Sequence, residues 1–368
     1  MLRVLVFILL FSSITCYAEN IDDLLKKVME KYNLPALAAA VTKDGKIVAS
    51  GAVGLRNSAA KDKVTLQDKF HIGSCTKSMT ATLAAMFVEE GKIKWTSTIA
   101  EIFPELKDSF LKDYHSVTLE QLLSHTGGIN SIPNSHRDIW MKIYNKKNEL
   151  SPVEQRKLLI SEVLKLPPAY EPGKGFTYSN SGTTIAGMML EKVSGKAWED
   201  LLIDKLAKPL GIISIGYGLA AKDASKIDQP YGHVQQGKVN IPVPPGKFVG
   251  NPSAIAPAGL VHLTVEDFAR YTAFYAARCS KLLKIESFKK LTQPVKNNFA
   301  LGWVAVKRPW GGDVITHDGS NTMNYAVMWI APEKNFSVVV MTNTFGGDVM
   351  KGVDEMAGQL IFKFLSNK

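Results

Sequence analysis

Strand-forming patterns occur near both ends of this 368-residue chain, and the long stretch between them carries mostly helical patterns. Near the start, residues 36–42 and 46–54 flank Asp44-Gly45, a dipeptide that favours a tight hairpin turn. Near the end, four further strand-like runs are separated by short turns, at residues 299–306, 313–317, 324–330 and 336–343. Short connections join antiparallel neighbours. The simplest architecture therefore combines the two ends of the chain into one antiparallel sheet.

Helical periodicity marks the remaining segments. Apolar side chains recur on one face in residues 21–32, 265–277 and 348–365. We expect the first and last of these helices to cover the sheet. The middle of the chain holds further helical patterns, at residues 119–123, 153–166, 183–193 and 198–206. Residues 213–258 are rich in glycine and proline and are predicted to form loops.

These patterns predict an α+β fold with two domains. Residues 19–104 and 211–368 are expected to form an antiparallel sheet flanked by helices, and residues 105–210 a mostly helical inserted domain. We expect the functional site in a cleft between the two.

The N-terminus is predicted to be a secretory signal peptide. Arg3 supplies a positive charge, residues 4–11 are apolar, and residues 12–18 are small or polar. The apolar run is too short to be a stable membrane anchor, and cleavage is expected near Ala18. The protein is therefore expected in the periplasm or secreted. Cys16 could be the lipidated cysteine of a lipoprotein, but the residues before it match the lipoprotein signal sequence poorly.

Composition restricts the class of protein. With 46% hydrophobic and 21% charged residues, the chain resembles ordinary globular proteins, and its net charge of +10 is spread over scattered pairs such as Lys26-Lys27. A solvated surface is the expected role of these charges, and the export signal disfavours nucleic acid as a partner. Without the signal peptide only Cys75 and Cys279 remain, so disulfides are not expected to build the fold.

One of four Ser-x-x-Lys matches stands in a distinctive context. The matches begin at Ser58, Ser74, Ser109 and Ser287, and only Ser74 follows an apolar approach and opens a long helical pattern. That pattern ends at Gly91, a plausible left-handed cap. A serine hydroxyl needs a nearby proton acceptor, and Lys77 lies one helical turn beyond Ser74. The motif alone fits a helix-capping serine with a solvated lysine better than it fits a catalytic pair.

Two further segments are candidates for the same site. Tyr178-Ser179-Asn180 follows the Pro172-Gly173 loop and precedes a helical pattern, although a packed tyrosine would fit as well. His317-Asp318-Gly319-Ser320 ends a predicted strand, where glycine permits a close backbone approach.

Taken together and in this order, the three segments resemble the cleft elements of the serine β-lactamase and penicillin-binding protein superfamily. The chain looks most like the class C β-lactamase-related branch, which includes D-peptidases and esterases. Residues 122–129 and 172–180 add to the resemblance, which covers about residues 20–365.

The resemblance implies roles for individual residues. Ser74 would attack a carbonyl group and become acylated, while Lys77 and Tyr178 would share its proton; which of the two is the base stays open. Asn180 would orient Lys77 and the substrate. No metal or other cofactor is implied.

The strand end would complete the site. The backbone N–H groups of Ser74 and Ser320 would form an oxyanion hole, with His317 and Gly319 on the substrate side. His317-Asp318-Gly319 replaces the usual Lys-Thr-Gly. A neutral histidine and an aspartate that faced the cleft would disfavour a substrate carboxylate.

We therefore expect an exported serine hydrolase that cleaves an ester or a D-amino-acid peptide or amide. A true class C-like β-lactamase or a D-Ala-D-Ala carboxypeptidase is the second candidate, and an inert cell-wall peptide-binding protein is the third. The substrate is expected to be a small molecule or peptide, with cell-wall fragments among the candidates. The sequence has no Gly-x-Ser-x-Gly, His-Glu-x-x-His or phosphate-binding loop motif. His125 is expected to stabilise a turn.

Overall fold

The computed structural model describes residues 18–131, 137–246, 249–278 and 281–366. The predicted signal peptide up to residue 17 lies outside the described residues, as do Cys16 and Cys279.

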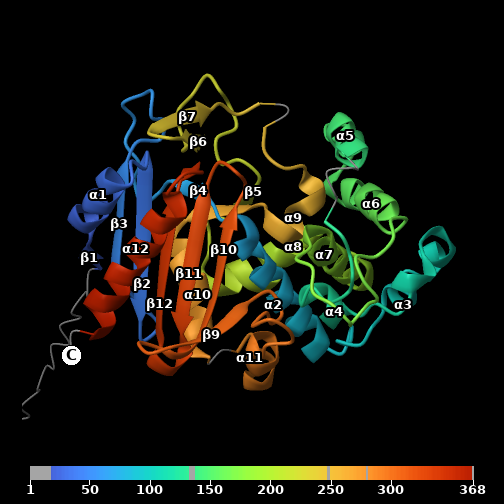
Figure 1. Ribbon diagram of the computed structural model, residues 1–368. Coiled ribbons are helices and arrows are strands. Elements are labelled where there is room, and N and C mark those ends of the chain that lie inside the picture. Colours follow the sequence, from blue (N-terminus) through green and yellow to red (C-terminus); the bar gives the residue numbers. More distant parts are fainter. Residues whose placement is uncertain (1–17, 132–136, 247–248, 279–280, 367–368) are drawn as a thin grey trace, which may run out of the picture.

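Segments from both ends of the chain form one seven-stranded sheet (Figure 1). Its order is β1 (Glu19–Asn20), β3 (Lys46–Gly54), β2 (Ala36–Lys43), β12 (Phe336–Thr342), β11 (Tyr325–Ala331), β10 (Gly312–Ser320) and β9 (Val304–Arg308). The N-terminal hairpin joins the C-terminal strands through β2 and β12, with Leu37 opposite Thr342. Every pair is antiparallel except the short edge pair of β1 with β3, which is parallel. The predicted sheet is thus confirmed, and the parallel edge strand is an addition to it.

The central strands are buried on both faces because helices cover the sheet from two sides. On β2, Ala38 and Ala40 belong to one apolar core, while Leu37 and Val41 belong to the other. Helices α1 (Asp22–Lys31) and α12 (Val349–Ile361) pack on the second face, as predicted, and α10 (Val265–Ala277) packs on the first. Strands buried on both sides read as nearly continuous apolar runs, which explains the composition of β2 and β12.

The other helices lie mainly to one side of the sheet (Figure 1). They are α2 (Thr76–Glu89), α3 (Ile99–Ile102), α4 (Leu119–Leu123), α5 (Arg137–Lys146), α6 (Pro152–Val163), α7 (Asn180–Ser194), α8 (Trp198–Leu202), α9 (Ala256–Gly259) and α11 (Ile285–Thr292). Within the described part of residues 105–210 every regular element is helical, as the sequence predicted. The patterns of α5 and α11 were missed. None of the helices in the described ranges is long and apolar enough to cross a membrane.

Residues 213–258 contain more regular structure than the predicted loops. Two small sheets draw on this segment: β4 (Lys69–His71), β8 (Val261–Thr264) and β5 (Gly216–Tyr217) form one, and β13 (Thr344–Phe345), β6 (Gly232–Gln236) and β7 (Val239–Val243) form the other. The loop prediction was therefore wrong for the β6–β7 hairpin. Pro242 occurs in β7 because that strand lies at the edge of its sheet, where a missing N–H costs no pairing.

Helix α2 lies at the centre of the molecule. Its residues are buried from Thr76 to Phe87, and it contacts α7, α8, α9 and α11. A helix that is buried all round belongs to the core of a larger protein. One continuous apolar core includes residues of α2, of the helical region and of the sheet, so α2 joins the two predicted domains.

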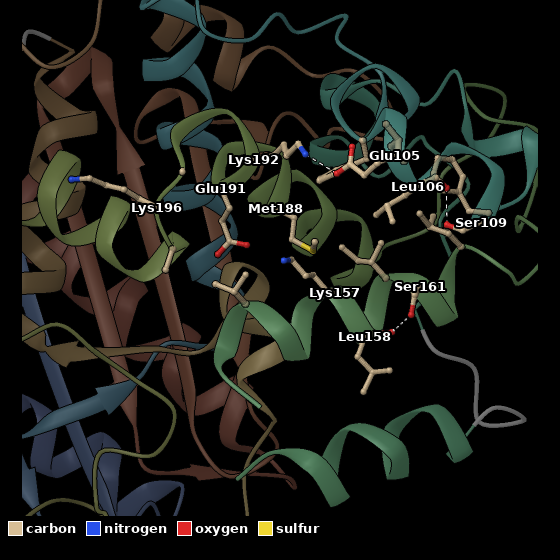
Figure 2. Close-up of a pocket in the computed structure, with 18 residues that line it drawn as sticks. Glu105, Leu106, Ser109, Lys157, Leu158, Ser161, Met188, Glu191, Lys192 and Lys196 are labelled. Atoms are coloured by element: carbon tan, nitrogen blue, oxygen red, sulfur yellow. Dashed lines mark hydrogen bonds and ion pairs between the residues drawn. The ribbon is translucent and has the colours of Figure 1, made fainter. Parts of the chain in front are cut away.

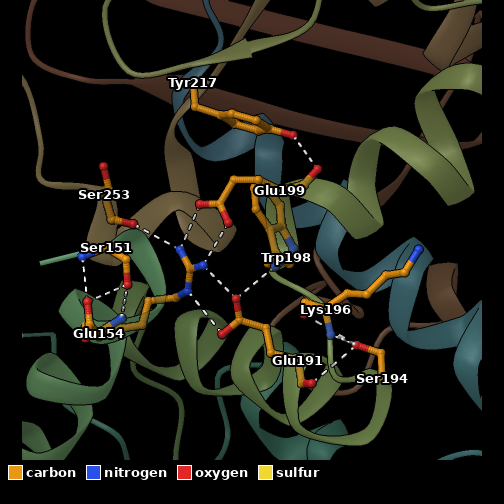
Figure 3. Close-up of polar contacts among 10 residues, drawn as sticks. Ser151, Glu154, Glu191, Ser194, Lys196, Trp198, Glu199, Tyr217 and Ser253 are labelled. Atoms are coloured by element: carbon orange, nitrogen blue, oxygen red, sulfur yellow. Dashed lines mark hydrogen bonds and ion pairs between the residues drawn. The ribbon is translucent and has the colours of Figure 1, made fainter.

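A buried ion network ties the helical region together (Figure 3). Arg156 on α6 is fully buried and donates to Glu191 on α7 at 2.6 Å and to Glu199 on α8 at 2.8 Å. It also donates to the carbonyl of Ser253, at 3.2 Å, just before α9. Because the two glutamates are largely buried as well, removing the arginine would leave their charges without a partner in the interior.

We therefore predict that Arg156→Met lowers the free energy of unfolding by about 3–5 kcal/mol, the usual cost of breaking a buried ion pair. Urea unfolding followed by circular dichroism measures the change. The control is Lys142→Met, which breaks an exposed ion pair between α5 and Glu162 on α6 and should cost less than about 1 kcal/mol. Equal effects of the two substitutions would contradict the assignment.

Candidate active site

Ser74 and Lys77 lie together at the start of the central helix. A single 3-10 turn, Gly73–Cys75, leads directly into α2 and carries Ser74. The Lys77 side chain is fully buried, and its Nζ lies 3.0 Å from the Ser74 Oγ. The predicted spacing of one helical turn therefore brings the two side chains into hydrogen-bond contact.

Two further acceptors hold the Lys77 amine. The Oδ1 of Asn180, the first residue of α7, lies 2.6 Å from Nζ, and the carbonyl oxygen of Ala258 on α9 lies 2.7 Å away. Both oxygens can only accept, so they hold two N–H groups of the amine. Burial lowers the pKa of Lys77 to about 7. In its neutral form the amine therefore keeps a lone pair facing Ser74.

Tyr178 lies close to both residues. The Lys77 Nζ lies 4.7 Å from the centre of its ring, and the Ser74 hydroxyl is near enough to its phenol to lower the pKa of Tyr178, against the larger effect of burial. About 37% of the residue is exposed, yet burial around its hydroxyl raises its pKa overall. The three residues predicted to share a proton are thus close together, and the raised pKa keeps the Tyr178 phenol protonated near pH 7.

The loop that carries Tyr178 is held by two residues. His125 Nδ1 accepts a hydrogen bond from the Ser179 N–H at 3.2 Å, and the His125 ring centre lies 4.6 Å from that of Tyr178. Ser131 Oγ accepts from the Asn180 N–H at 3.1 Å and donates to the Tyr178 carbonyl at 3.3 Å. His125 has a left-handed backbone with φ of 61°, consistent with the expected turn. Ser131 carried no signal in the sequence.

The end of β10 lies against the turn that carries Ser74. A side chain on Gly73 would place its Cβ 2.3 Å from the Ser320 backbone nitrogen, and one on Gly319 would place it 2.3 Å from the Ser74 nitrogen. Only glycine fits at either position, because real Cβ atoms never approach so closely. Strand β9 pairs with β10 only as far as Thr316, so β10 extends beyond its neighbour here. The Ser74 and Ser320 backbones are thereby brought together.

His317 and Asp318 lie on opposite faces of β10. The His317 side chain is buried near Tyr178 and Phe299, and burial, with the nearby Lys77 charge, lowers its pKa to about 4. Asp318 is exposed on the face that carries Tyr325, whose hydroxyl donates to its Oδ2 at 3.1 Å. The sequence left the direction of the Asp318 side chain open. Because successive side chains on a strand point to opposite faces, Asp318 points away from the cleft, and the condition for direct repulsion of a substrate carboxylate is not met.

Cys75 is a packing residue beside the site. Its thiol is buried and free, and Sγ lies 3.4 Å from the His317 carbonyl. Burial raises the pKa of the thiol, which keeps it protonated. Within the ranges that the structure describes, no three His, Cys, Asp or Glu side chains are grouped to hold a metal ion.

Comparison with known proteins identifies the family. The chain matches the Beta-lactamase family over residues 21–361. Protein flp from Staphylococcus aureus (strain N315) is 22% identical over 349 residues, which cover 93% of this chain and 66% of flp. The chain therefore spans slightly less than two thirds of that relative.

Two solved structures share the fold. The octameric penicillin-binding protein homologue from Pyrococcus abyssi has a TM-score of 0.75 and 22% identity, over 94% of this chain and 76% of that one. The D-amino acid amidase from Ochrobactrum anthropi SV3 has a TM-score of 0.74 and 19% identity, over 93% of this chain and 97% of that one. Because the family match covers most of the chain, we conclude that this protein belongs to the Beta-lactamase family.

Proposed function

We propose that the protein is an exported hydrolase that forms an acyl-enzyme on Ser74 and cleaves an ester or a D-amino-acid peptide or amide bond. The observation that carries this proposal is the contact of the Ser74 hydroxyl with the buried Lys77 amine, 3.0 Å away, and the position of that amine 4.7 Å from the centre of the Tyr178 ring. The shared fold with a D-amino acid amidase supports the amide class. Export rests on the N-terminal sequence pattern alone.

In the acylation step, neutral Lys77 takes the proton of Ser74 as Oγ bonds to the substrate carbonyl carbon. The lowered pKa of Lys77 and the raised pKa of Tyr178 favour Lys77 as the base. When the tetrahedral intermediate collapses, the bond to the leaving amine or alkoxide breaks. The phenol lies in position to hand a proton to that group, with Lys77 supplying its replacement. Water then releases the acyl group by the same steps in reverse.

The two backbone N–H groups at Ser74 and Ser320 are proposed to stabilise the negative oxygen of the intermediate. Their placement depends on the close contact of Gly73 with the end of β10. An oxyanion-hole donor lowers the barrier by about 3 kcal/mol in other hydrolases.

The proposed order of substrate preference depends on His317. With a pKa of about 4, this residue is neutral at pH 7, so it supplies no cation for a substrate carboxylate where the usual Lys-Thr-Gly motif has a lysine. This favours esters and amidated peptides over β-lactams and D-Ala-D-Ala peptides, which carry a carboxylate. The Asp318 side chain does not face the substrate, because it lies on the other face of the sheet, although its charge adds to the effect of burial that raises the pKa of Tyr178.

The first prediction is a covalent adduct on Ser74. Intact mass spectrometry after treatment with a fluorophosphonate should show one added group on the wild type and none on Ser74→Ala. The Lys77–Asn180 and Lys77–Ala258 contacts do not depend on the hydroxyl, so the variant should remain folded. A panel of nitrophenyl esters, D-amino-acid amides and a chromogenic cephalosporin then ranks the substrates.

Two outcomes of this experiment would contradict the proposal. Adduct formation on both proteins would remove Ser74 from the mechanism. Peptide binding without turnover of any panel member, unchanged in Ser74→Ala, would favour the inert binding protein. Rapid cephalosporin hydrolysis would leave the nucleophile intact and reverse the substrate order.

The second prediction concerns pH. Since Lys77 must be neutral to accept a proton, kcat/KM for an ester should fall about tenfold per pH unit below about pH 7, near its lowered pKa. Tyr178→Phe should slow the reaction, but kcat/KM should still begin to fall at the same pH as in the wild type. If the phenolate were the base, this fall would begin near pH 10 or above and would vanish in that variant.

The third prediction tests the strand contact. Gly319→Ala should lower kcat/KM by about 10²–10³-fold, the cost of losing one oxyanion donor, because the new Cβ would displace the Ser74 nitrogen. Gly358→Ala on α12 is the matched control, because an added Cβ there meets no atom within 4 Å. Wild-type activity in Gly319→Ala would show that the strand and the turn are not held in this contact.

A further inference from the structure

A second cavity lies in the helical region, among residues that take no part in the proposed active site (Figure 2). It is open to solvent on one side and has a volume of about 740 Å³ beside α6, α7 and the 3-10 segment Pro104–Ser109. Most of its lining is apolar, including Ile99, Phe103, Phe110, Leu158, Leu164 and Met188. This volume falls within the range of about 300–1,000 Å³ that small-molecule sites occupy.

Most charged groups that line the cavity already have partners. Lys192 on α7 pairs with Glu105 at 2.6 Å, and Lys196 pairs with Asp204 at 3.1 Å. The Glu191 carboxylate accepts from Arg156 and from the Trp198 N–H. These groups therefore add little unbalanced charge to the cavity.

Lys157 on α6 is different. It is an exposed residue, and in the part of the chain that the structure describes its ammonium makes no hydrogen bond and no ion pair within 4.0 Å. The hydrogen bond from Lys192 is the main cause of the lowered pKa of Glu105, and the Lys157 charge adds to it. The same charge adds to the effect of Ser151 on the pKa of Glu154. Figure 2 shows its amine end directed toward the middle of the ring of lining side chains. One unpaired cation beside an apolar cavity complements a ligand with a single negative charge and an apolar body.

We propose that this cavity binds a free long-chain monocarboxylate, with its alkyl chain between α6 and α7 and its carboxylate on Lys157. The chain accounts for the apolar lining, and the single carboxylate matches the single unpaired ammonium. Lys192 and Glu105 join α7 to the Pro104–Ser109 segment and close one side of the cavity. This assignment does not depend on the acyl-enzyme.

Calorimetric titration with dodecanoate below its micelle concentration tests the proposal. One molecule should bind per chain, and each methylene removed from the chain should weaken binding about fourfold. Lys157→Met should weaken dodecanoate binding about tenfold and leave dodecanol binding unchanged. The matched control is Lys165→Met, which removes an equal charge from a residue outside the lining and should bind as the wild type does.

Two further variants locate the ligand. Ser161→Trp places an indole at an exposed position of the lining and should abolish binding, while Ser74→Ala should bind dodecanoate like the wild type. The proposal is overturned if dodecanoate does not bind, or if Lys157→Met and Lys165→Met weaken it equally. It is also overturned if Ser161→Trp leaves affinity unchanged, or if dodecanol binds as tightly as dodecanoate. Loss of binding in Ser74→Ala would place the ligand in the active-site cleft instead.

Discussion

The buried amine of Lys77 joins three parts of the chain at one point. Its partners come from the turn before α2, from the first residue of α7 and from a carbonyl of α9. A buried ammonium loses its hydration, which lowers its pKa and makes the neutral amine accessible near pH 7. The chemistry proposed for Ser74 depends on this loss of hydration, because a solvated lysine would keep its proton at pH 7 and could not accept one from Ser74.

The surroundings of Lys77 explain why so much of the molecule is built tightly around α2. Arg156, on α6, bonds to the segment before α9 as well as to α7 and α8. Helix α9 in turn supplies one of the two acceptors that orient the Lys77 amine. From the other side, Gly73 and Gly319 allow the strand end to approach the turn that carries Ser74. The helical region thus positions the Lys77 amine beside the Ser74 hydroxyl, and the sheet positions the end of β10 beside the same turn.

Asp318 shows what the sequence leaves open. The sequence places a histidine and an aspartate next to each other in the segment His317-Asp318-Gly319, but it does not say which of the two faces the substrate. Side chains on a strand alternate between faces, so only one of two successive residues can face the cleft. His317 lies on the side of Ser74, while Asp318 bonds to Tyr325 on the opposite face. The neutral histidine alone remains as the reason to disfavour a carboxylate substrate.

From sequence alone, the hairpin at Asp44-Gly45, the helices from 265 and 349, the combined sheet and the Ser74, Lys77 and Tyr178 candidates could be predicted. Periodicity, turn residues and motif spacing act within a short window, so they leave a pattern in the chain. Only the tertiary structure brought Ala258 to Lys77 and Ser131 to Asn180, and only it left Lys157 beside an apolar cavity. A backbone carbonyl has no side-chain signature, and a contact between distant segments is decided by packing of the whole fold rather than by any local pattern.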